Sequence, residues 1–230
     1  MTVRVGINGF GRIGRNILRA IIENNRTDIS VVAINDLGPV KTNAHLLKYD
    51  SVHGKFPNNI DITENTINVG TGPIRVSAIK NPEELEWSDV DIALECTGIF
   101  NDKDIAIRHL KNGSKRVLVS APCVNADKTI VFGVNHQTLT PDDLVVSNAS
   151  CTTNCLAPVV KVLHEKLGVK RGFMTTIHSY TGDQPTLDTM HSDLYRSRAA
   201  AMNMIPTFTG AARAVGLVIP ELNGLSLIHI

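Results

Sequence analysis

The chain has 230 residues, of which 43% are hydrophobic and 20% are charged, so a sizeable packed core is available to it. Its 23 basic and 22 acidic residues nearly balance, which gives no electrostatic reason to expect nucleic acid or a membrane surface as a partner. No apolar run is long enough for a transmembrane helix, and the first residues do not resemble a signal peptide, so we expect a cytoplasmic protein. The four cysteines lack the spacing of a zinc site, and no metal is expected.

The first 36 residues predict a strand, a glycine turn, a helix and a second strand. Residues 3–7 alternate apolar with polar or small side chains and end at Asn8, as a strand does. Apolar residues at helical spacing follow the glycines of residues 9–14, and residues 30–34 form a buried-strand run before Asp36. This βαβ pattern predicts two parallel strands joined by a right-handed crossover.

The alternation of strands and helices continues to about residue 150. Strand patterns cover residues 91–96, 116–120 and 145–147, and helical patterns cover residues 41–48 and 102–111. A loop over residues 50–59 precedes β-type patterns at 60–69 and 73–79, which predict a small antiparallel insertion. The fold class expected for residues 1–150 is therefore α/β, a doubly wound parallel sheet of the Rossmann type.

The character of the chain changes after residue 150. Residues 152–167 predict a helix and residues 172–178 predict a strand. Residues 180–206 are rich in Gly, Pro, Ser and Arg and predict a long functional loop. We expect a second domain over residues 151–230.

A dinucleotide site is predicted at the first turn of the chain. A lone Gly-x-Gly-x-x-Gly motif is weak evidence, but here it follows a strand, opens a helix and precedes Asp36, 22 residues after Gly14. A carboxylate at that position grips a ribose diol and repels a 2′-phosphate, which favours NAD over NADP. The alternative is a tight glycine turn with an exposed aspartate. Lys80 either contacts the adenine side or is simply solvated.

A nucleophilic thiol is predicted at Cys151, where a strand ends and a helix begins. A helix N-terminus lowers the pKa of a thiol, and the thiolate is the reactive form. His178 ends the next predicted strand and is the candidate base, the alternative being a hydrogen-bonded core histidine. Cys155 is expected to be more buried and to serve packing.

These residues together resemble the phosphorylating glyceraldehyde-3-phosphate dehydrogenases. The segment at residues 147–158 is highly specific, because Rossmann domains in general do not carry it. The matching stretches are INGFGRIGR (7–15), INDL (34–37), LLKYDSVHG (46–54), ECTGIF (95–100), SNASCTTNCLAP (147–158), TTIHSYTGDQ (175–184) and IPTFTGAARAVG (205–216).

The resemblance implies a reaction and its residues. Cys151 attacks the aldehyde of glyceraldehyde 3-phosphate to give a hemithioacetal, His178 acts as base, and inorganic phosphate releases 1,3-bisphosphoglycerate from the thioester; the direction, glycolytic or gluconeogenic, stays open. With the glycine-loop pattern, it places NAD on Asn8, Gly9, Phe10, Gly11, Arg12, Ile13, Asp36, Lys80, Thr97, Gly98 and Ser120. Substrate and phosphate are expected on Ser150, Thr152, Thr209 and Gly210, and on Thr181, Asp183 and Arg196.

The resemblance also implies a homotetramer in the full-length form and reveals departures. Phe208 and Arg213 replace the family's usual small hydroxyl residue and lysine. After Gly224 the family continues for about a hundred residues, whereas residues 225–230 do not match it. We therefore expect an incomplete α+β catalytic domain in a truncated chain that is poorly stable or inactive. Two further alternatives stay open: an erythrose-4-phosphate dehydrogenase and an inactive NAD-binding fragment.

Overall fold

A computed structural model describes residues 2–207, 209–223 and 227–229. The chain divides into two compact units, residues 1–130 with 136–150 and residues 131–135 with 151–230. The short segment 131–135 belongs to the second unit, where the Lys161 ammonium donates hydrogen bonds to the carbonyls of Gly133 and Val134 at 3.1 and 2.9 Å.

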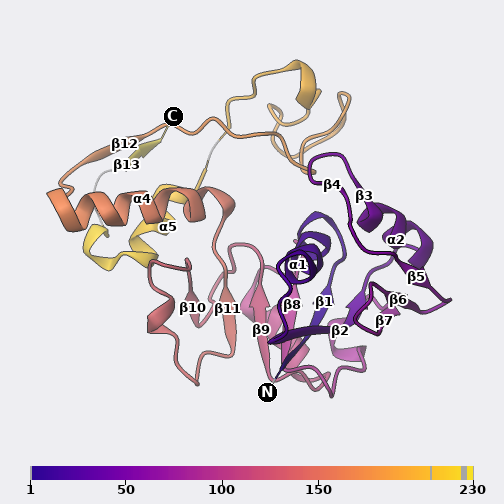
Figure 1. The fold of residues 1–230 in the computed structure, drawn as a ribbon. Helices are drawn as coiled ribbons and strands as arrows, with labels where there is room; N and C mark the ends of the chain where they lie inside the picture. Colours follow the sequence, from indigo (N-terminus) through magenta and orange to yellow (C-terminus); the bar gives the residue numbers. More distant parts are fainter. Residues whose placement is uncertain (1, 208, 224–226, 230) are drawn as a thin grey trace. The chain divides into compact units, whose positions relative to one another are not determined.

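The first unit is built on one mixed sheet of nine strands in the order β10-β11-β9-β8-β1-β2-β7-β6-β5 (Figure 1). All neighbours from β10 to β7 pair in parallel, and only β6 and β5 are antiparallel. The strands are β1 Val3–Asn8, β2 Ile29–Asn35, β5 Asp61–Ile62, β6 Thr66–Asn68, β7 Pro73–Ser77, β8 Ile92–Glu95, β9 Arg116–Val119, β10 Lys128–Thr129 and β11 Val145–Ser147.

Both faces of this sheet are covered. On one face Leu18 of helix α1 (Arg12–Glu23) packs with Val5 and Ile7 of β1, and α2 (Val40–Lys48) adds Leu47 to the same cluster. On the other face Trp87 packs against Ala33 and Ala93, close to the 3-10 turn Pro82–Glu84. Since parallel strands alternate with helices, the expected α/β doubly wound fold is confirmed.

Three local features of the first unit differ from the expectations. The segments at 60–69 and 73–79 join the main sheet, with β7 parallel to β2, because β7 pairs with the otherwise open edge of that strand. The helix expected over 102–111 is α3 (Lys103–Ala106) followed by a 3-10 turn, Ile107–Leu110. The expected loop 50–59 contains part of a short hairpin, β3 (Tyr49–Asp50) with β4 (Gly54–Lys55); a 3-10 turn spans His136–Thr138.

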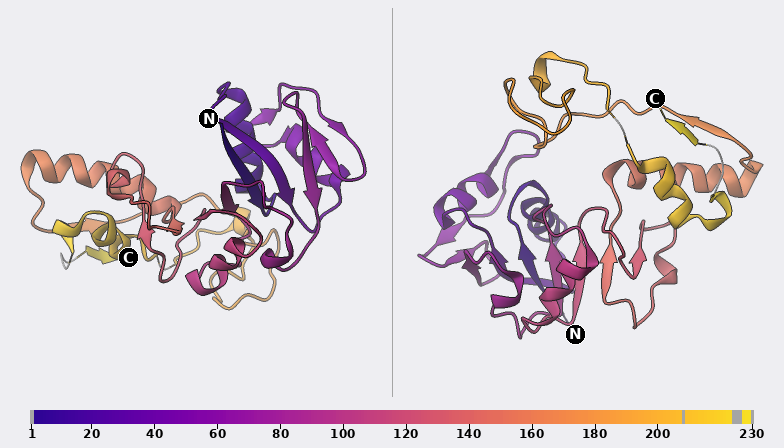
Figure 2. Two further views of the ribbon diagram at one scale, coloured as in Figure 1. Left: turned by 90° about the horizontal axis from the view of Figure 1, so that it is seen from below. Right: turned by 180° about the vertical axis from the view of Figure 1, so that it is seen from behind.

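The second unit is centred on two helices, α4 (Cys151–Leu167) and α5 (Ala211–Val218), which lie side by side in both views of Figure 2. Strand β12 (Gly172–Met174) pairs in parallel with β13 (Leu227–His229). The strand expected to reach residue 178 ends at Met174. The long loop holds a 3-10 turn, Ala200–Met202, and another follows α5 at Pro220–Leu222. Phe208 and Gly224 lie outside the described residues.

No helix of the described part of the chain has both the length and the apolar character that spanning a membrane requires.

Candidate active site

The candidate nucleophile, Cys151, is the first residue of α4 and is exposed. The turn that leads into the helix holds Ala149 at φ +56°, a left-handed conformation that costs a residue with a Cβ about 1–2 kcal/mol. The Ala149 amide donates to the Ser147 hydroxyl at 3.1 Å, which helps to hold this turn. Strain of this kind is typical of segments whose direction matters for function.

His178 lies beside the thiol within the second unit. Its Nε2 is 3.1 Å from the Cys151 Sγ, and its Nδ1 is 2.5 Å from the Ser179 carbonyl oxygen. Because a carbonyl only accepts, Nδ1 carries a proton. Nε2 is then free either to accept the thiol proton or, once protonated, to donate to the thiolate, so the pair can exchange one proton along a single hydrogen bond.

The two groups shift each other's protonation equilibria. Partial burial raises the pKa of Cys151. The hydrogen bond and charge of His178, together with the hydroxyl and amide of Thr152, lower it by more, so the pKa lies below its ordinary value. The hydrogen bond to Ser179 and then the one to Cys151 raise the pKa of His178. Both shifts favour a thiolate next to an imidazolium.

The other cysteines have different environments. Burial raises the pKa of Cys96 to about 12 and also raises that of Cys123. Cys155 is exposed, as Cys151 is, so the expectation that it is buried and serves packing is wrong. Thr153 and Ala157 are instead the buried residues of α4, and Cys155 lies on another face of the helix. Among the described residues no cluster of metal-ligating side chains is found.

The long loop of the second unit brings two predicted anion-site residues together. The Arg196 guanidinium donates to the Asp183 carboxylate at 2.5 Å and to the Thr207 hydroxyl at 2.9 Å. His191 lies 3.4 Å from the other oxygen of Asp183. The hydrogen bonds from Arg196 and His191 hold the pKa of Asp183 below its ordinary value. A carboxylate repels phosphate, so Asp183 is suited to orienting Arg196 rather than to touching an anion. No local sequence pattern marks Thr207 or His191 as part of this group.

The remaining predicted anion-site residues lie at turns and helix starts. Thr209 accepts a hydrogen bond from the Ala211 amide at 3.2 Å, and Gly210 is the residue that precedes the first turn of α5. The Thr181 amide donates to the Gln184 side chain at 3.1 Å. Thr152 lies in the first turn of α4, and Ser150 directly precedes that helix. Arg213 lies on α5 and is exposed.

The candidate dinucleotide loop is shaped by glycines and by Asp36. A Cβ on Gly14 would lie 2.2 Å from the Gly9 carbonyl oxygen, and Gly9 itself has φ +89°, so both positions require glycine. Nothing lies within 4 Å of a Cβ placed on Gly11, and no side chain caps α1 there. The Asp36 carboxylate accepts from the amides of Phe10 and Gly38, both at 2.8 Å. The uncapped backbone amides at the N-terminus of α1, with open space beside Gly11, suit the binding of a pyrophosphate.

The side chains of Arg12 and Asn8 are already engaged. Arg12 pairs with Asp50 at 2.5 and 3.1 Å, and its hydrogen bonds, with those of the Val52 and His53 amides, hold the pKa of Asp50 well below its usual range. Asn8 is buried and bonded to neighbouring side chains. The backbone of these two residues is the part that protein side-chain contacts leave for a ligand. Ile13 is exposed.

The other predicted cofactor residues lie after the parallel strands. Thr97 and Gly98 follow β8, Gly98 with φ +74°. Ser120 follows β9, and its amide donates to the Glu95 carbonyl at 2.9 Å. Lys80 is exposed beyond β7.

A buried polar cluster at the end of β8 is not indicated by any sequence motif. It consists of Glu95, His109 and Asn112, with Trp87 stacked on His109 at 5.6 Å between ring centroids and 17° between planes. Because these residues are brought together only by the fold, no local pattern in the sequence marks them.

Comparison with known proteins gives a consistent result. Residues 3–103 match the family model described as "Glyceraldehyde 3-phosphate dehydrogenase, NAD binding domain", and residues 150–227 match the C-terminal domain of the same family. NAD is therefore the dinucleotide cofactor, and the protein is an NAD-dependent dehydrogenase.

Curated relatives agree with the family models. Glyceraldehyde-3-phosphate dehydrogenase of Cereibacter sphaeroides is 72% identical over 224 residues, which is 97% of this chain and 67% of the relative. The enzymes of that name from Xanthobacter flavus and Geobacillus stearothermophilus are 70% and 56% identical, and the matches span 68% and 67% of their lengths. The chain belongs to the glyceraldehyde 3-phosphate dehydrogenase family.

Proposed function

We propose that this protein catalyses the NAD-dependent oxidative phosphorylation of glyceraldehyde 3-phosphate to 1,3-bisphosphoglycerate. The observation that carries the proposal is the 3.1 Å contact between Cys151 Sγ and His178 Nε2 at the start of α4. It occurs in a chain whose relatives, at up to 72% identity, are named for this aldehyde. In this reading residues 1–150 bind NAD and residues 151–230 carry the chemistry.

The thiol and imidazole perform the covalent steps. His178 Nε2 takes the proton of Cys151, the thiolate adds to the aldehyde carbon, and His178 returns the proton to the former carbonyl oxygen, which gives a hemithioacetal. His178 then removes the hydroxyl proton of this adduct as hydride departs, which leaves a thioester on Cys151. Bound NAD supplies the hydride acceptor. The oxygen of inorganic phosphate attacks the thioester carbon, the C–S bond breaks, and the acyl phosphate leaves with Cys151 again a thiolate.

The backbone around the pair supports these proton transfers. The Ser179 carbonyl accepts from Nδ1, so it keeps the imidazole in one orientation and stabilises its charged form. We assign the two anions of the reaction to Arg196 with Thr181, oriented by Asp183, and to Ser150, Thr152, Thr209 and Gly210. Hydroxyls, amides and a guanidinium are the donors that phosphate oxygens prefer.

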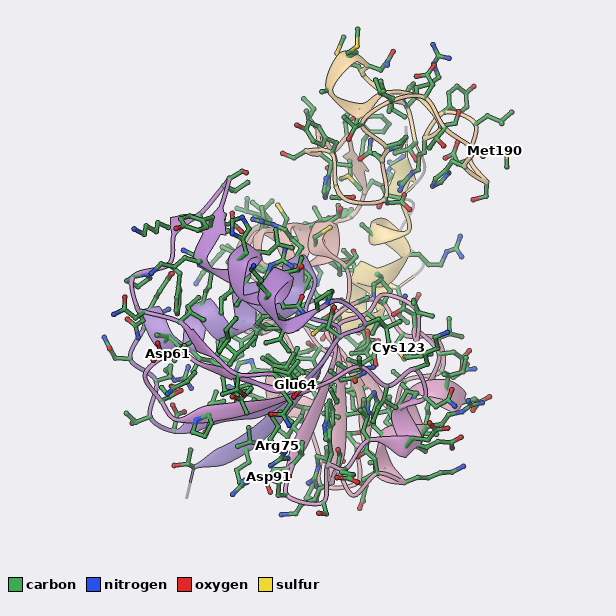
Figure 3. All side chains as sticks on the ribbon, turned by 90° about the vertical axis from the view of Figure 1, so that its right-hand side faces the viewer. Asp61, Glu64, Arg75, Asp91, Cys123 and Met190 are labelled. Atoms are coloured by element: carbon green, nitrogen blue, oxygen red, sulfur yellow. The ribbon has the colours of Figure 1, made fainter. Side chains whose placement is uncertain are left out.

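We infer that the full-length protein works in the cytoplasm as a homotetramer. The long loop of the second unit exposes several large apolar side chains, among them Met190 at its outer edge (Figure 3). The exposed large apolar residues of this loop are Tyr180, Leu187, Met190, Leu194, Tyr195, Met202 and Met204. A run of exposed apolar side chains is typical of a surface that another protein covers.

The test is NADH formation from glyceraldehyde 3-phosphate, NAD and phosphate by the 230-residue chain and its variants; normal turnover by the unaltered chain would show that the inactivity expected from its sequence after Gly224 is wrong. Cys151→Ser and His178→Asn should lower turnover by about a hundredfold or more, as loss of a nucleophile or base does. Cys155→Ser, on the same helix, should leave turnover unchanged. Equal loss in the Cys155 and Cys151 variants would contradict the assignment.

Two comparisons separate the alternatives. Faster turnover of erythrose 4-phosphate than of glyceraldehyde 3-phosphate would make the chain a dehydrogenase for the longer aldehyde. NAD binding without any turnover, together with a Cys151 thiol no more reactive than free cysteine, would make it a passive NAD-binding fragment. The chain spans about two thirds of the length of the relatives it matches, so a full-length relative serves as the positive control.

A further inference from the structure

A buried carboxylate lies where the parallel sheet reverses its direction of growth. From β1 the chain winds to β2 on one side, and it later returns to β8 on the other side of β1. Dinucleotides bind outside the carboxyl ends of the strands at this kind of reversal. Glu95, the last residue of β8, is in register with Asn8, the last residue of β1. The side-chain amide of Asn8 donates a hydrogen bond to the Glu95 carboxylate at 2.6 Å.

Both oxygens of the Glu95 carboxylate are fully used. Oε2 accepts from Asn8 and from His109 Nε2, which is 2.9 Å away. Oε1 accepts from the Thr97 amide at 2.8 Å and from the Thr97 hydroxyl. Glu95 is 1% exposed, so these four donors replace the water that an exposed carboxylate would have. A buried charge held in this way fixes the direction of each donor.

The protonation state of His109 follows from its neighbours. The Ser114 amide donates to Asn112 Oδ1 at 3.1 Å, which fixes the orientation of the Asn112 side chain. The Asn112 NH₂ group then faces the Pro82 carbonyl oxygen at 2.8 Å and His109 Nδ1 at 3.2 Å. Since this group only donates, Nδ1 carries no proton. His109 is therefore a neutral imidazole that donates to Glu95 through Nε2–H.

The chain of hydrogen bonds continues on the other side of Glu95. Asn8 Oδ1 accepts from the Asn35 side chain at 2.8 Å. Asn35 Oδ1 accepts in turn from the Ser77 hydroxyl and the Ile79 amide at 2.9 and 2.8 Å. The network thus ties together the carboxyl ends of β8, β1, β2 and β7, the strand ends beside which the cofactor loops begin.

We propose that Glu95 is a positioning residue for NAD, which acts through Asn8 and Thr97 and depends on neutral His109 as a donor. The proposal rests on the NAD binding of the proposed function. Asn8 leads into the glycine loop, and Thr97 leads into the turn at Gly98. If one donor lost its acceptor, the turn that carries it would no longer be held in its binding geometry. The affinity for NAD would therefore fall.

The first experiment compares Glu95→Gln with Glu64→Gln, an exposed glutamate in the turn between β5 and β6 that Figure 3 labels. The amide of glutamine presents a donor where the carboxylate accepted, so it opposes either the Thr97 amide or the Asn8 and His109 donors. We expect the NAD dissociation constant of the 230-residue chain, measured by calorimetry, to rise about tenfold or more in the first variant and to stay within about twofold in the second.

The second experiment separates positioning from simple packing. His109→Gln and His109→Leu both remove the stacking on Trp87, but glutamine can still place an N–H near Glu95 and leucine cannot. We expect the glutamine variant to bind NAD about tenfold more tightly than the leucine variant. Equal affinity of the two variants would overturn the proposal, as would wild-type affinity in folded Glu95→Gln. If that variant does not fold, the His109 pair decides.

The neutral state of His109 is tested in the unaltered chain. Nitrogen NMR at neutral pH should show a proton on Nε2 and none on Nδ1, and protons on both nitrogens would overturn the assignment. Failure of the wild-type chain to bind NAD would instead contradict the proposed function, and the tautomer measurement would still stand on its own.

Discussion

At the scale of single residues, the four cysteines show how strongly surroundings set thiol chemistry. Cys96 is half-buried beyond β8, and its pKa is raised to about 12 by burial, so it stays protonated. Cys151 is exposed at a helix start beside an imidazole, and its pKa is lowered. The same functional group therefore favours the thiol in one place and the thiolate in the other.

Alkylation should report this difference directly. Because the pKa of Cys151 is lowered, its thiolate persists to lower pH, and the rate of its reaction with iodoacetamide should fall only as pH drops through that lowered pKa. Removing the imidazole in His178→Asn should move the midpoint to higher pH. Peptide-resolved mass spectrometry would separate Cys151 from the exposed Cys155. A midpoint unchanged by the substitution would show that His178 does not set this pKa.

The sequence could indicate residues whose local pattern carries the chemistry. Cys151 stands in a specific segment at a strand-to-helix turn, and Asp36 has a fixed spacing from the glycine loop. Glu95 and His109 could not be identified, because their partners are far along the chain: Asn8 is 87 residues from Glu95. The exposure of Cys155 could not be predicted either, because helical spacing alone does not say which face of α4 packs against α5.

At the scale of elements, the strand before His178 is shorter than its sequence pattern predicts. Residues 172–178 contain the β-branched run Thr175–Ile177, which favours a strand. The observed strand ends at Met174, four residues before the predicted end. A pattern read from one segment does not show which of its residues find a pairing strand, and His178 lies in a loop.

The glycines of the dinucleotide loop allow a paired prediction. Gly14→Ala would place a Cβ 2.2 Å from a backbone oxygen and should lower the free energy of unfolding by about 2 kcal/mol or more, as overpacking against rigid atoms does. Gly11→Ala meets no atom within 4 Å and should leave unfolding nearly unchanged while NAD binding weakens. Urea unfolding and NAD calorimetry on both variants check this; equal stability loss in both would contradict it.

An aspartate beyond the sheet should make stability depend on acid. Asp89 accepts from Arg75 of β7 at 2.6 and 2.9 Å and from Arg4 of β1, and Figure 3 labels Arg75. The hydrogen bonds from Arg75, and then those from Arg4, lower the pKa of Asp89 to about 2.

A carboxyl group whose pKa is lowered in the folded state stabilises the fold at any pH above its pKa in the unfolded chain, about 4. This contribution is lost as the pH falls through the pKa of the folded state. Asp89→Asn should therefore be less stable than the wild type at neutral pH, and the difference should close at strongly acidic pH. Urea unfolding across this range measures it, with the exposed Asp61→Asn as control. A difference that did not change with pH would show that packing, not charge, is responsible.

At the scale of the whole molecule, the chain divides between Ser150 and Cys151. The dinucleotide loop and Asp36 belong to one unit, and Cys151, His178 and the long loop belong to the other. The sequence changes in character after residue 150, which predicts a second domain from residue 151. The return of residues 131–135 to the second unit could not be foreseen, since it depends on contacts such as those of Lys161.

Assembly should depend on the long loop of the second unit. Leu194 is 79% exposed there, and an aspartate at this position would put a charge into any surface that buries it. Leu194→Asp should shift sedimentation toward smaller species, whereas Leu139→Asp, on the first unit, should not. Unchanged sedimentation of the Leu194 variant would remove this loop from the interface.

Trp87 gives the molecule a built-in optical label. It is the single tryptophan of the chain, and its ring is buried against His109 in the first unit. Its emission therefore follows the melting of that unit alone, while circular dichroism follows the helices of both. If heating separates the two signals, the halves of this protein lose their structure independently; if the curves coincide, they melt as one cooperative body.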